Sequence, residues 1–219
     1  MALSKVNIAE AATRLGQPFA PVNLATVNDM AVNLIRCEGK FQWHMHDQMD
    51  EIFYVHSGSM LLETELGNVV LHAGELVFAP ANVAHCPSAV RPALVLFCIK
   101  YMAFPRNGDR RTLPRHDKLE SKVNLAQRAR LLKPFAAEDV ATFDDFVLRA
   151  LVCDGAEAMH AHAHDDELAL VVEGAVELEL AEQAVELQAG ELIVVPKNTP
   201  HRLRADARAT VLLLSRIKV

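Results

Sequence analysis

The chain has 219 residues, of which 51% are hydrophobic, and its formal net charge is −6 at pH 7. A chain of this length and composition can bury an ample core in one or two domains. The negative charge gives no electrostatic basis for binding nucleic acid, and no apolar run approaches the roughly 18 residues that a membrane span needs. We therefore expect neither a nucleic-acid partner nor a membrane partner.

The chain opens with a short predicted helix. Asn7 is a suitable N-cap, Glu10 follows three residues later, and Gly16 and Pro18 end the pattern, which predicts a helix within residues 7–16. Asn124, Gln127 and Pro134 repeat this arrangement in the second half of the chain. We expect both helices to lie outside a sheet and to cover its edge or a subunit contact.

The cysteines and the N-terminal segment bear on the cellular location. Cys37 and Cys153 are interpreted as buried thiols, and none of the cysteines has the CxxC spacing of a metal or redox motif. The start of the sequence has no basic region followed by an apolar stretch, so a secretory signal is not expected. Together these features favour the reducing cytoplasm.

From residue 24 the pattern changes to short apolar runs separated by turn residues. Such a series of short strands with Gly and Pro between them indicates an antiparallel sandwich or barrel. In the run from residue 59, Met60, Leu62 and Thr64 alternate with residues of the opposite face, as in a strand with one wet face. A turn is expected at 67–68. The expected strands of the first half cover residues 30–37, 42–46, 51–57, 59–66, 69–72, 75–80 and 93–100.

A group of polar residues lies among these strands. His44 and His46 are one residue apart, so both imidazoles would share one face of a strand. Glu51 follows before the apolar run IFYV, and His85 comes at the end of a later apolar strand, from which it can return to the first two histidines across a closed sheet. Three imidazoles and one carboxylate form a chemically sensible set for one divalent cation.

The same pattern occurs twice in the chain. A second copy reads GAEAMHAHAHDDELALVVEG over residues 155–174 and GELIVVPKNTPH over residues 190–201. Each position of this copy lies 116 residues after its counterpart, as His160 does after His44, and no insertion interrupts the register. The chain therefore consists of two fused copies of one domain of ordinary size.

These stretches resemble the two signature motifs of the cupin superfamily. The first motif is glycine, HxH, glutamate and glycine, and the second is glycine, Pro-x-Gly and histidine. Asn82 stands where the second motif usually has glycine, and four residues rather than five separate Gly39 from His44. Asparagine tolerates a left-handed backbone better than most residues, so the departure at Asn82 is mild.

The resemblance implies an all-β protein, a bicupin with two tandem barrels of the double-stranded β-helix or jelly-roll type, each preceded by a short helix. Each copy is most similar to small cupins of type 2 that are described as mannose-6-phosphate-isomerase-like. This is a likeness of fold, and it does not assign a reaction.

The repeat divides the chain into an N-terminal cupin domain over residues 1–103, a linker over residues 104–120 and a C-terminal cupin domain over residues 121–219. The linker is rich in Pro, Gly and charged residues and lacks periodicity. Its arginines favour a solvated connector, and the alternative is a lid that carries an anionic substrate. Because single cupins commonly dimerise, we expect the halves to pair as an intramolecular pseudo-dimer, and association into a homodimer is left open.

The resemblance also implies one divalent metal ion in each domain. Mixed nitrogen and oxygen ligands suit Fe, Mn, Co, Ni, Cu or Zn, and the sequence does not choose among them. The alternative is a set of hydrogen-bonded core histidines, which is disfavoured because apolar walls make unpaired imidazoles and a carboxylate costly to bury. The expected ligands are His44, His46, Glu51 and His85 in the first half, and His160, His162, Glu167 and His201 in the second.

Three further residues are candidates for shaping the site, although no catalytic base can be named. If Glu51 faces inward, Phe53 does too, and its counterpart Ala169 should leave the second pocket roomier. Gln42 is expected to face inward as well. His164 continues the alternation of the second HxH, and we expect it to be exposed or to lie behind the ligands. The neighbouring Asp165 and Asp166 are expected to be solvated.

Two functions of different class follow from these expectations. The first is a divalent-metal-dependent enzyme acting on a small oxygenated molecule, such as a hydroxy or keto acid or a sugar-like compound, by isomerase, dioxygenase, decarboxylase or lyase chemistry. The second is a non-catalytic cupin that binds or senses a small molecule in metal-supported pockets. A purely structural metal is disfavoured, because two identical ligand sets with open coordination would serve no purpose there.

Overall fold

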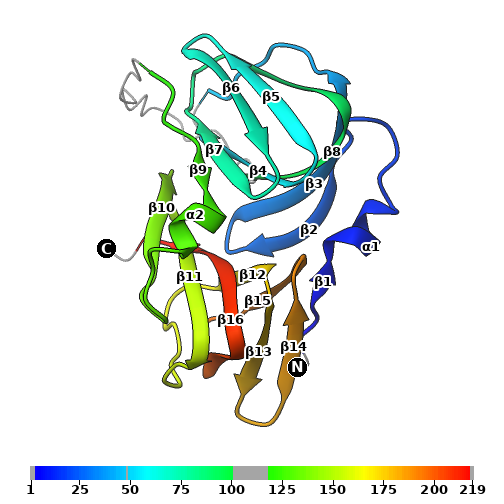
Figure 1. Ribbon diagram of the computed structural model, residues 1–219. Coiled ribbons are helices and arrows are strands. Elements are labelled where there is room, and N and C mark those ends of the chain that lie inside the picture. The colour runs from blue at the N-terminus through cyan, green and yellow to red at the C-terminus, as the bar shows by residue number, and fades with distance from the viewer. Residues whose placement is uncertain (1–2, 48, 101–117, 218–219) are drawn as a thin grey trace. The chain divides into compact units, whose positions relative to one another are not determined.

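The structure is a computed structural model that describes residues 3–47, 49–100 and 118–217. The described residues are mostly strands, which form two eight-stranded sheets (Figure 1). Contacts divide the chain into two compact units, one of residues 14–123 and the other of residues 1–13 together with 124–219. This all-β architecture of two tandem barrels confirms the predicted fold class.

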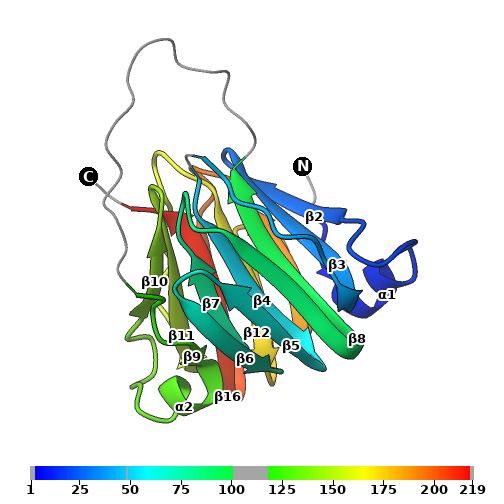
Figure 2. The same ribbon diagram turned by 90° about the horizontal axis from the view of Figure 1, so that it is seen from above.

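The first unit contains one antiparallel sheet. Its strands follow the order β2-β3-β8-β4-β7-β9, and β5 joins it by pairing with both β8 and β6 (Figure 2). The bounds of these strands are β2 Val22–Val27, β3 Met30–Lys40, β4 Glu51–Ser57, β5 Ser59–Thr64, β6 Gly67–His72, β7 Glu75–Ala79, β8 His85–Lys100 and β9 Val123–Asn124.

The second unit repeats this order as β10, β11, β16, β12, β15 and β1, with β13 pairing with β14 and β16. Its elements are β1 Val6–Asn7, α1 Ile8–Ala12, α2 Leu125–Ala129, β10 Glu138–Phe143, β11 Phe146–Ala156, β12 Glu167–Glu173, β13 Ala175–Leu180, β14 Ala184–Gln188, β15 Glu191–Val195 and β16 His201–Arg216.

The long strand β8 closes the first barrel because it changes partners along its length. Its first residues, from His85, pair with β5, whereas its later residues pair with β3 and β4. Alternate side chains of the strands then point to a shared interior. Phe53, Val55, Met60 and Leu62 belong to this apolar cluster and are fully or nearly fully buried, as the alternation in the sequence predicted.

Two short helices begin where the sequence predicts. The side chain of Asn7 accepts a hydrogen bond from the backbone N–H of Glu10, and Asn124 accepts one from Gln127. Each caps a free N–H group of the first helical turn. Both helices are shorter than expected, since α1 ends at Ala12 and α2 at Ala129.

The segment before each helix adds a strand to the barrel of the other repeat. Near the N-terminus, β1 pairs with β15, and the equivalent β9 extends the sheet of β7. Lys5 forms an ion pair with Glu191 at 2.7 Å, and Lys122 forms the matching ion pair with Glu75 at 2.7 Å. The grouping by contacts therefore differs from the sequence division, because residues 1–13 belong with the second barrel.

Some local predictions were wrong. Residues 42–46 are not a strand, and β-type pairing there is limited to a single bridge between His44 and His85. The turn predicted at 67–68 lies two residues earlier, at 65–66, because Gly67 already begins β6. Nearly all of the predicted linker, and with it the lid alternative, lies outside the described residues.

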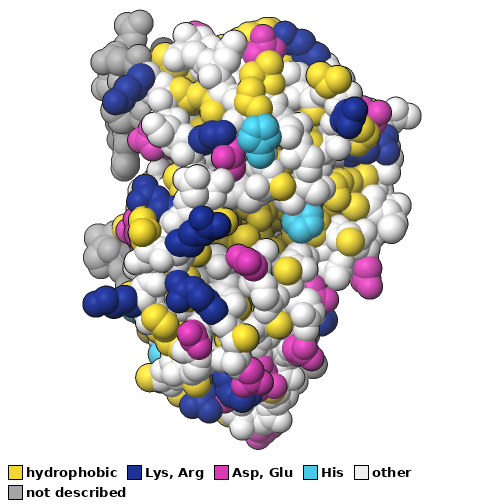
Figure 3. Space-filling model, viewed as in Figure 1, with side chains coloured by type: hydrophobic (Ala, Val, Ile, Leu, Met, Phe, Trp, Pro, Cys, Tyr) yellow, Lys and Arg dark blue, Asp and Glu magenta, His cyan; other side chains and the backbone are white. Residues whose placement is uncertain are grey.

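Two observations concern the surface. Among the described residues, no helix is long and apolar enough to cross a membrane. Basic and acidic side chains lie among one another over the face that Figure 3 shows, with hydrophobic side chains between them. This mixture agrees with the modest net charge of the whole sequence.

Substituting Gly58 with Ala should destabilise the first barrel. The backbone there has a φ of +82°, and an added Cβ atom would lie 2.9 Å from the backbone of Ala93. The left-handed conformation alone costs a non-glycine residue roughly 1–3 kcal/mol, and the contact adds to this. Urea denaturation should show a lower midpoint.

Two glycines provide controls for this experiment. Gly39 has a similar φ of +79° with open space around it, whereas Gly16 has open space and no positive φ. G39A should therefore lose less stability than G58A, and G16A should lose least. Equal midpoints for G58A and G16A would contradict the packing described for Gly58.

Candidate metal centres

The HxH segment of the first half is held against the start of β8. The backbone N–H of His44 donates to the carbonyl of His85 at 3.1 Å, and the N–H of His85 donates back to His44 at 2.8 Å. This reciprocal pair is a single antiparallel bridge. It brings residues that lie far apart in the chain side by side, so that their imidazoles share one face.

Backbone carbonyls orient two of these imidazoles. Nδ1–H of His44 donates to the carbonyl of Gln42 at 3.0 Å, and Nδ1–H of His85 donates to the carbonyl of Val83 at 2.9 Å. A carbonyl can only accept, so Nδ1 carries the hydrogen in both rings. Each Nε2 is then left with a lone pair that faces away from these carbonyls.

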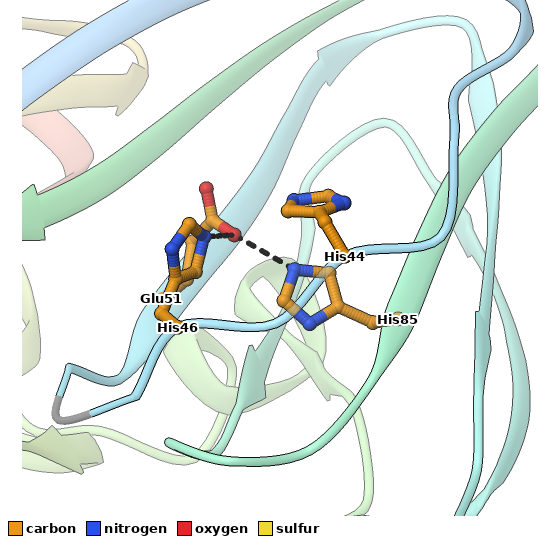
Figure 4. Close-up of side chains that lie close together, drawn as sticks. All are labelled: His44, His46, Glu51 and His85. Atoms are coloured by element: carbon orange, nitrogen blue, oxygen red, sulfur yellow. Dashed lines mark hydrogen bonds and ion pairs between the residues drawn. The ribbon is translucent and has the colours of Figure 1, made fainter.

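Glu51, the first residue of β4, completes the cluster. Its Oε2 lies 3.2 Å from Nε2 of His46 and 3.0 Å from Nε2 of His85. Figure 4 shows the three imidazoles and this carboxylate converging on one another. One potential ligand atom from each of the four residues lies within 4.8 Å of all the others.

The second half builds the same cluster from its own repeat. His160 and His201 form the reciprocal backbone pair, with hydrogen bonds of 2.9 and 2.8 Å. Nδ1–H of each donates to the carbonyl two residues earlier, at 3.1 Å for His160 and 2.9 Å for His201. Oε2 of Glu167 lies 3.2 Å from Nε2 of His162 and 3.7 Å from Nε2 of His201.

A tight turn before each third histidine supports the HxH segment. Asn82 has a left-handed backbone with a φ of +61°, and its N–H donates to the carbonyl of His46 at 2.9 Å. Asn198 has the same φ, and its N–H donates to His162 at 2.7 Å. Asparagine thus fills the place of the family's usual glycine, because both residues tolerate this conformation.

The buried carboxylates and imidazoles shift one another's pKa values. Burial by itself would raise the pKa of Glu51, but the hydrogen bonds with His46 and His85 hold it below its usual range. The same balance lowers the pKa of Glu167 to about 2. The hydrogen bond with Glu51 raises the pKa of His46, and burial lowers the pKa of His44. Each site therefore favours an ionised carboxylate beside its histidines.

The donor set fits a cation. When Nδ1 of His85 bonds to a carbonyl, its Nε2 lone pair faces the lone pairs of the Glu51 carboxylate at 3.0 Å. Two acceptors that close need a proton or a cation between them, because buried lone pairs without a partner are costly. Both clusters could hold a metal ion.

The structure places the other candidate residues as follows. Phe53 faces inward, with its ring centroid 5.9 Å from that of His85. Gln42 is exposed, and it contributes to the site through its backbone carbonyl, which orients His44. His164 is exposed, which agrees with one of the two alternatives stated for it. Trp43, next to His44, is half exposed.

Two equivalent supporting residues were missed at the sequence level. Asp50 and Asp166 each accept a hydrogen bond from a backbone N–H in the turn before the third histidine, at 2.9 Å from Ala81 and 3.0 Å from Lys197. Asp166 is partly exposed, in line with the expectation that it is solvated, but this hydrogen bond was not foreseen. The signal was available, because these aspartates occupy equivalent positions of the repeat directly before the ligand glutamates.

The two halves differ in the residue that lies next to the first histidine of each cluster. In the first half the ring of Phe41 meets that of His44 edge to face, with centroids 5.1 Å apart. In the second half the equivalent residue is Glu157, whose Oε1 lies 4.0 Å from Nδ1 of His160 and accepts the N–H of Leu203. The imidazole of His160 therefore has an acidic neighbour where that of His44 has an aromatic ring.

Comparison with known families agrees with this geometry. A model of the cupin domain matches residues 35–99 and 152–215, which together make up more than half of the chain. The chain belongs to the cupin domain family. Each match covers most of one repeat, including the HxH segment, the glutamate and the third histidine, so both halves are cupin domains.

Individual cupins provide a more distant comparison. The chain is 29% identical over 80 residues to the uncharacterized protein YdbB of Bacillus subtilis, a match that covers 36% of this chain and 71% of that protein. In fold it is similar to a cupin 2 conserved barrel domain protein from Leptotrichia buccalis, with a TM-score of 0.73 at 14% identity, covering 100% of this chain and 98% of the other.

Two enzymes of known structure have a similar fold. A salicylate 1,2-dioxygenase from Pseudaminobacter salicylatoxidans matches with a TM-score of 0.72 at 14% identity, covering 98% of this chain and 84% of the other. An oxalate decarboxylase from Bacillus subtilis matches with a TM-score of 0.61 at 13% identity, covering 99% and 76%. At this level of identity the likeness concerns the fold alone.

Metal binding by these clusters should weaken as the pH falls. The pKa of His46 is raised, and that of His201 is raised because the hydrogen bond with Glu167 outweighs burial. Protons therefore begin to compete with a cation at a pH above the ordinary imidazole pKa, and the competition grows as the pH falls. The affinity for metal should fall about tenfold per pH unit for each proton that the metal must displace. Competition titrations with Co²⁺ at pH 8, 7 and 6 measure this, and an affinity independent of pH would contradict ligation by imidazole.

Proposed function

We propose that each cupin domain holds one divalent metal ion through its three histidines and one glutamate, and that the protein is a metal-dependent enzyme. The observation that carries this proposal is the convergence of hydrogen-bond acceptors on one point in both barrels. In each half, imidazole Nε2 atoms lie within 3.7 Å of an ionised carboxylate oxygen. A cation satisfies all of these lone pairs at once.

The proposed ligand set also leaves room for a reactant. Four protein ligands do not complete the shell of an ion that takes five or six, so positions stay open for water or for an oxygen-bearing molecule. A bound metal ion acts there as a Lewis acid that polarises a ligand oxygen.

The protein's own residues would prepare this site in three ways. The carbonyls of Gln42 and Val83 hold their imidazoles in one tautomer and one orientation. The ionised Glu51 lowers the charge of the filled centre by one unit. The apolar interior around Phe53 and Val55 excludes bulk water, which strengthens electrostatic interactions with a bound molecule.

The proposed substrate is a small oxygenated molecule, namely a hydroxy or keto acid or a sugar-like compound, that can offer an oxygen pair to the metal. The names of the salicylate dioxygenase and the oxalate decarboxylase are in line with this class, since both refer to small carboxylic acids. The proposed reaction class stays isomerase, dioxygenase, decarboxylase or lyase, since metal-dependent enzymes of each class can act on an oxygenated substrate bound to the metal. The pseudo-dimer of the two halves and the cytoplasmic location stay predictions.

Metal analysis tests the proposed ligands. After removal of metal with a chelator and reloading with Co²⁺, the wild type should bind about two ions, and His46→Ala and His162→Ala about one each. Loss of a ligand should weaken its site by more than the roughly 10–100-fold typical of residues behind the ligands. The matched control is His164→Ala, which removes an exposed histidine outside the cluster and should keep both ions.

Turnover separates the enzyme from the binding module. The metal-loaded protein is incubated with hydroxy acids, keto acids and sugars, with and without dioxygen, and products are followed by mass spectrometry. Turnover that is lost on chelation and in at least one of the single-ligand variants supports the enzyme. Tight binding of one of these compounds without turnover supports the non-catalytic module instead, and failure to bind metal contradicts both.

A further inference from the structure

The two barrels carry the same donors but different walls. In the first barrel Phe53 is 2% exposed and its ring lies against His85 at 5.9 Å between centroids. Its direct partner across β4 and β8 is Phe97. In the second barrel the equivalent cross-strand pair is Ala169 and Leu213. Ala169 is the second residue after the proposed ligand glutamate, so it lies on the same face of its strand.

The exchange removes much of the side-chain bulk beside the second cluster. Replacing Phe53 and Phe97 by Ala169 and Leu213 removes about nine carbon atoms, and protein interiors are filled closely enough for such a change to matter. Larger residues elsewhere in the second barrel restore only about three of these carbons. They are Ile193 and Val195, which stand where the first barrel has Val77 and Ala79.

Around its glutamate, the second cluster is looser and more accessible than the first. The side chain of Glu167 is 11% exposed, against 6% for Glu51. Oε2 of Glu167 lies 3.7 Å from the third histidine of its cluster, whereas the equivalent distance at Glu51 is 3.0 Å. Both differences follow the direction expected if the ring of Phe53 presses on the first cluster and nothing of that size stands at Ala169.

We propose that the second centre is the one that takes the organic ligand, and that Phe53 restricts the first centre to the smallest oxygen donors. The inference rests on the proposed function, because the ligand's oxygen pair would bind the metal. The rest of the ligand would occupy the space beside Ala169, which lies between its cross-strand partners Ile193 and Leu213 and has Val171 on the same face of its strand. Such a lining selects an apolar group, and the missing ring sets its size at about one phenyl group.

The ligand class is therefore a 2-oxo acid with a compact apolar side chain. Pyruvate and phenylpyruvate are suitable probes, because they offer the same oxygen pair and differ in the size of the apolar group. Each centre can be studied alone in the full-length chain. His46→Ala leaves the second centre, and His162→Ala leaves the first.

The experiment follows the visible absorption of Co²⁺ in these two variants during titration with each acid. With the second centre alone, phenylpyruvate should bind at least as tightly as pyruvate. With the first centre alone, phenylpyruvate should bind at least about tenfold more weakly than pyruvate, since the ring of Phe53 must be displaced. Equal selectivity of the two centres would overturn the proposal.

Exchange of the wall residue tests the cause. Phe53→Ala in the first-centre variant should bring phenylpyruvate binding to the level of the second centre. Ala169→Phe in the second-centre variant should weaken phenylpyruvate at least about tenfold and keep Co²⁺ and pyruvate. Phe53→Leu and Ala169→Leu should give smaller shifts in the same directions if the larger changes impair folding. No shift in any of the four variants would overturn the role of Phe53.

One control and one outcome separate this inference from the proposed function. Met60→Val exchanges another wall residue for its counterpart in the second barrel and should leave the selectivity of the first centre unchanged. A shift as large as that of Phe53→Ala would count against a specific role for Phe53. If Co²⁺ binds but neither centre takes either acid, the proposed function itself fails for this substrate class, and the inference fails with it.

Discussion

A carboxylate buried among imidazoles in an apolar barrel is the constraint on which each half of this protein depends. An ionised group removed from water costs several kcal/mol unless opposite charge or hydrogen bonds compensate it. Glu51 and Glu167 are almost fully buried, and histidines from a loop and from a distant strand surround each of them. The backbone bridges from His44 to His85 and from His160 to His201 make this convergence possible, because they fix loop and strand in one register.

The rest of each barrel serves to hold these few residues in place. Left-handed asparagines and the aspartates at positions 50 and 166 shape the turn that carries the third histidine. Glycines at 58 and 174 lie so close to Ala93 and Ala209 that an added Cβ atom would come within about 3 Å of them. The glutamate and the histidines therefore owe their geometry to backbone conformation more than to their own side-chain contacts.

Duplication allows the two centres to diverge while the fold stays the same. The donors and their supporting turns are equivalent in both halves, whereas the walls differ at Phe53 and Ala169 and behind the first histidine at Phe41 and Glu157. Stability of a barrel depends on its total packing, so one half can lose a ring that the other keeps. The reciprocal placement of β1 and β9 adds a constraint, since each barrel is completed by the segment that precedes the other repeat.

The sequence by itself determined the architecture and predicted which residues come together in each cluster. The constant offset between the repeats, the alternation of apolar residues and the N-cap asparagines are local signals, and they predicted the barrels, the two short helices and the inward position of Phe53 correctly.

The tertiary structure decided what depends on partners distant in the chain. The HxH segment reads as a strand but makes a single bridge, because β8 begins only at His85 and the residues before it form the turn around Asn82. Asp166 reads as a solvated residue, but it binds a backbone N–H 31 residues away. Residues 4–13 open the first repeat, yet they join the second barrel, because its strand β15 offers an edge that β1 can extend. Hydrogen bonds between distant segments leave no periodic trace in a sequence, so the repeat marked equivalent positions but did not reveal their partners.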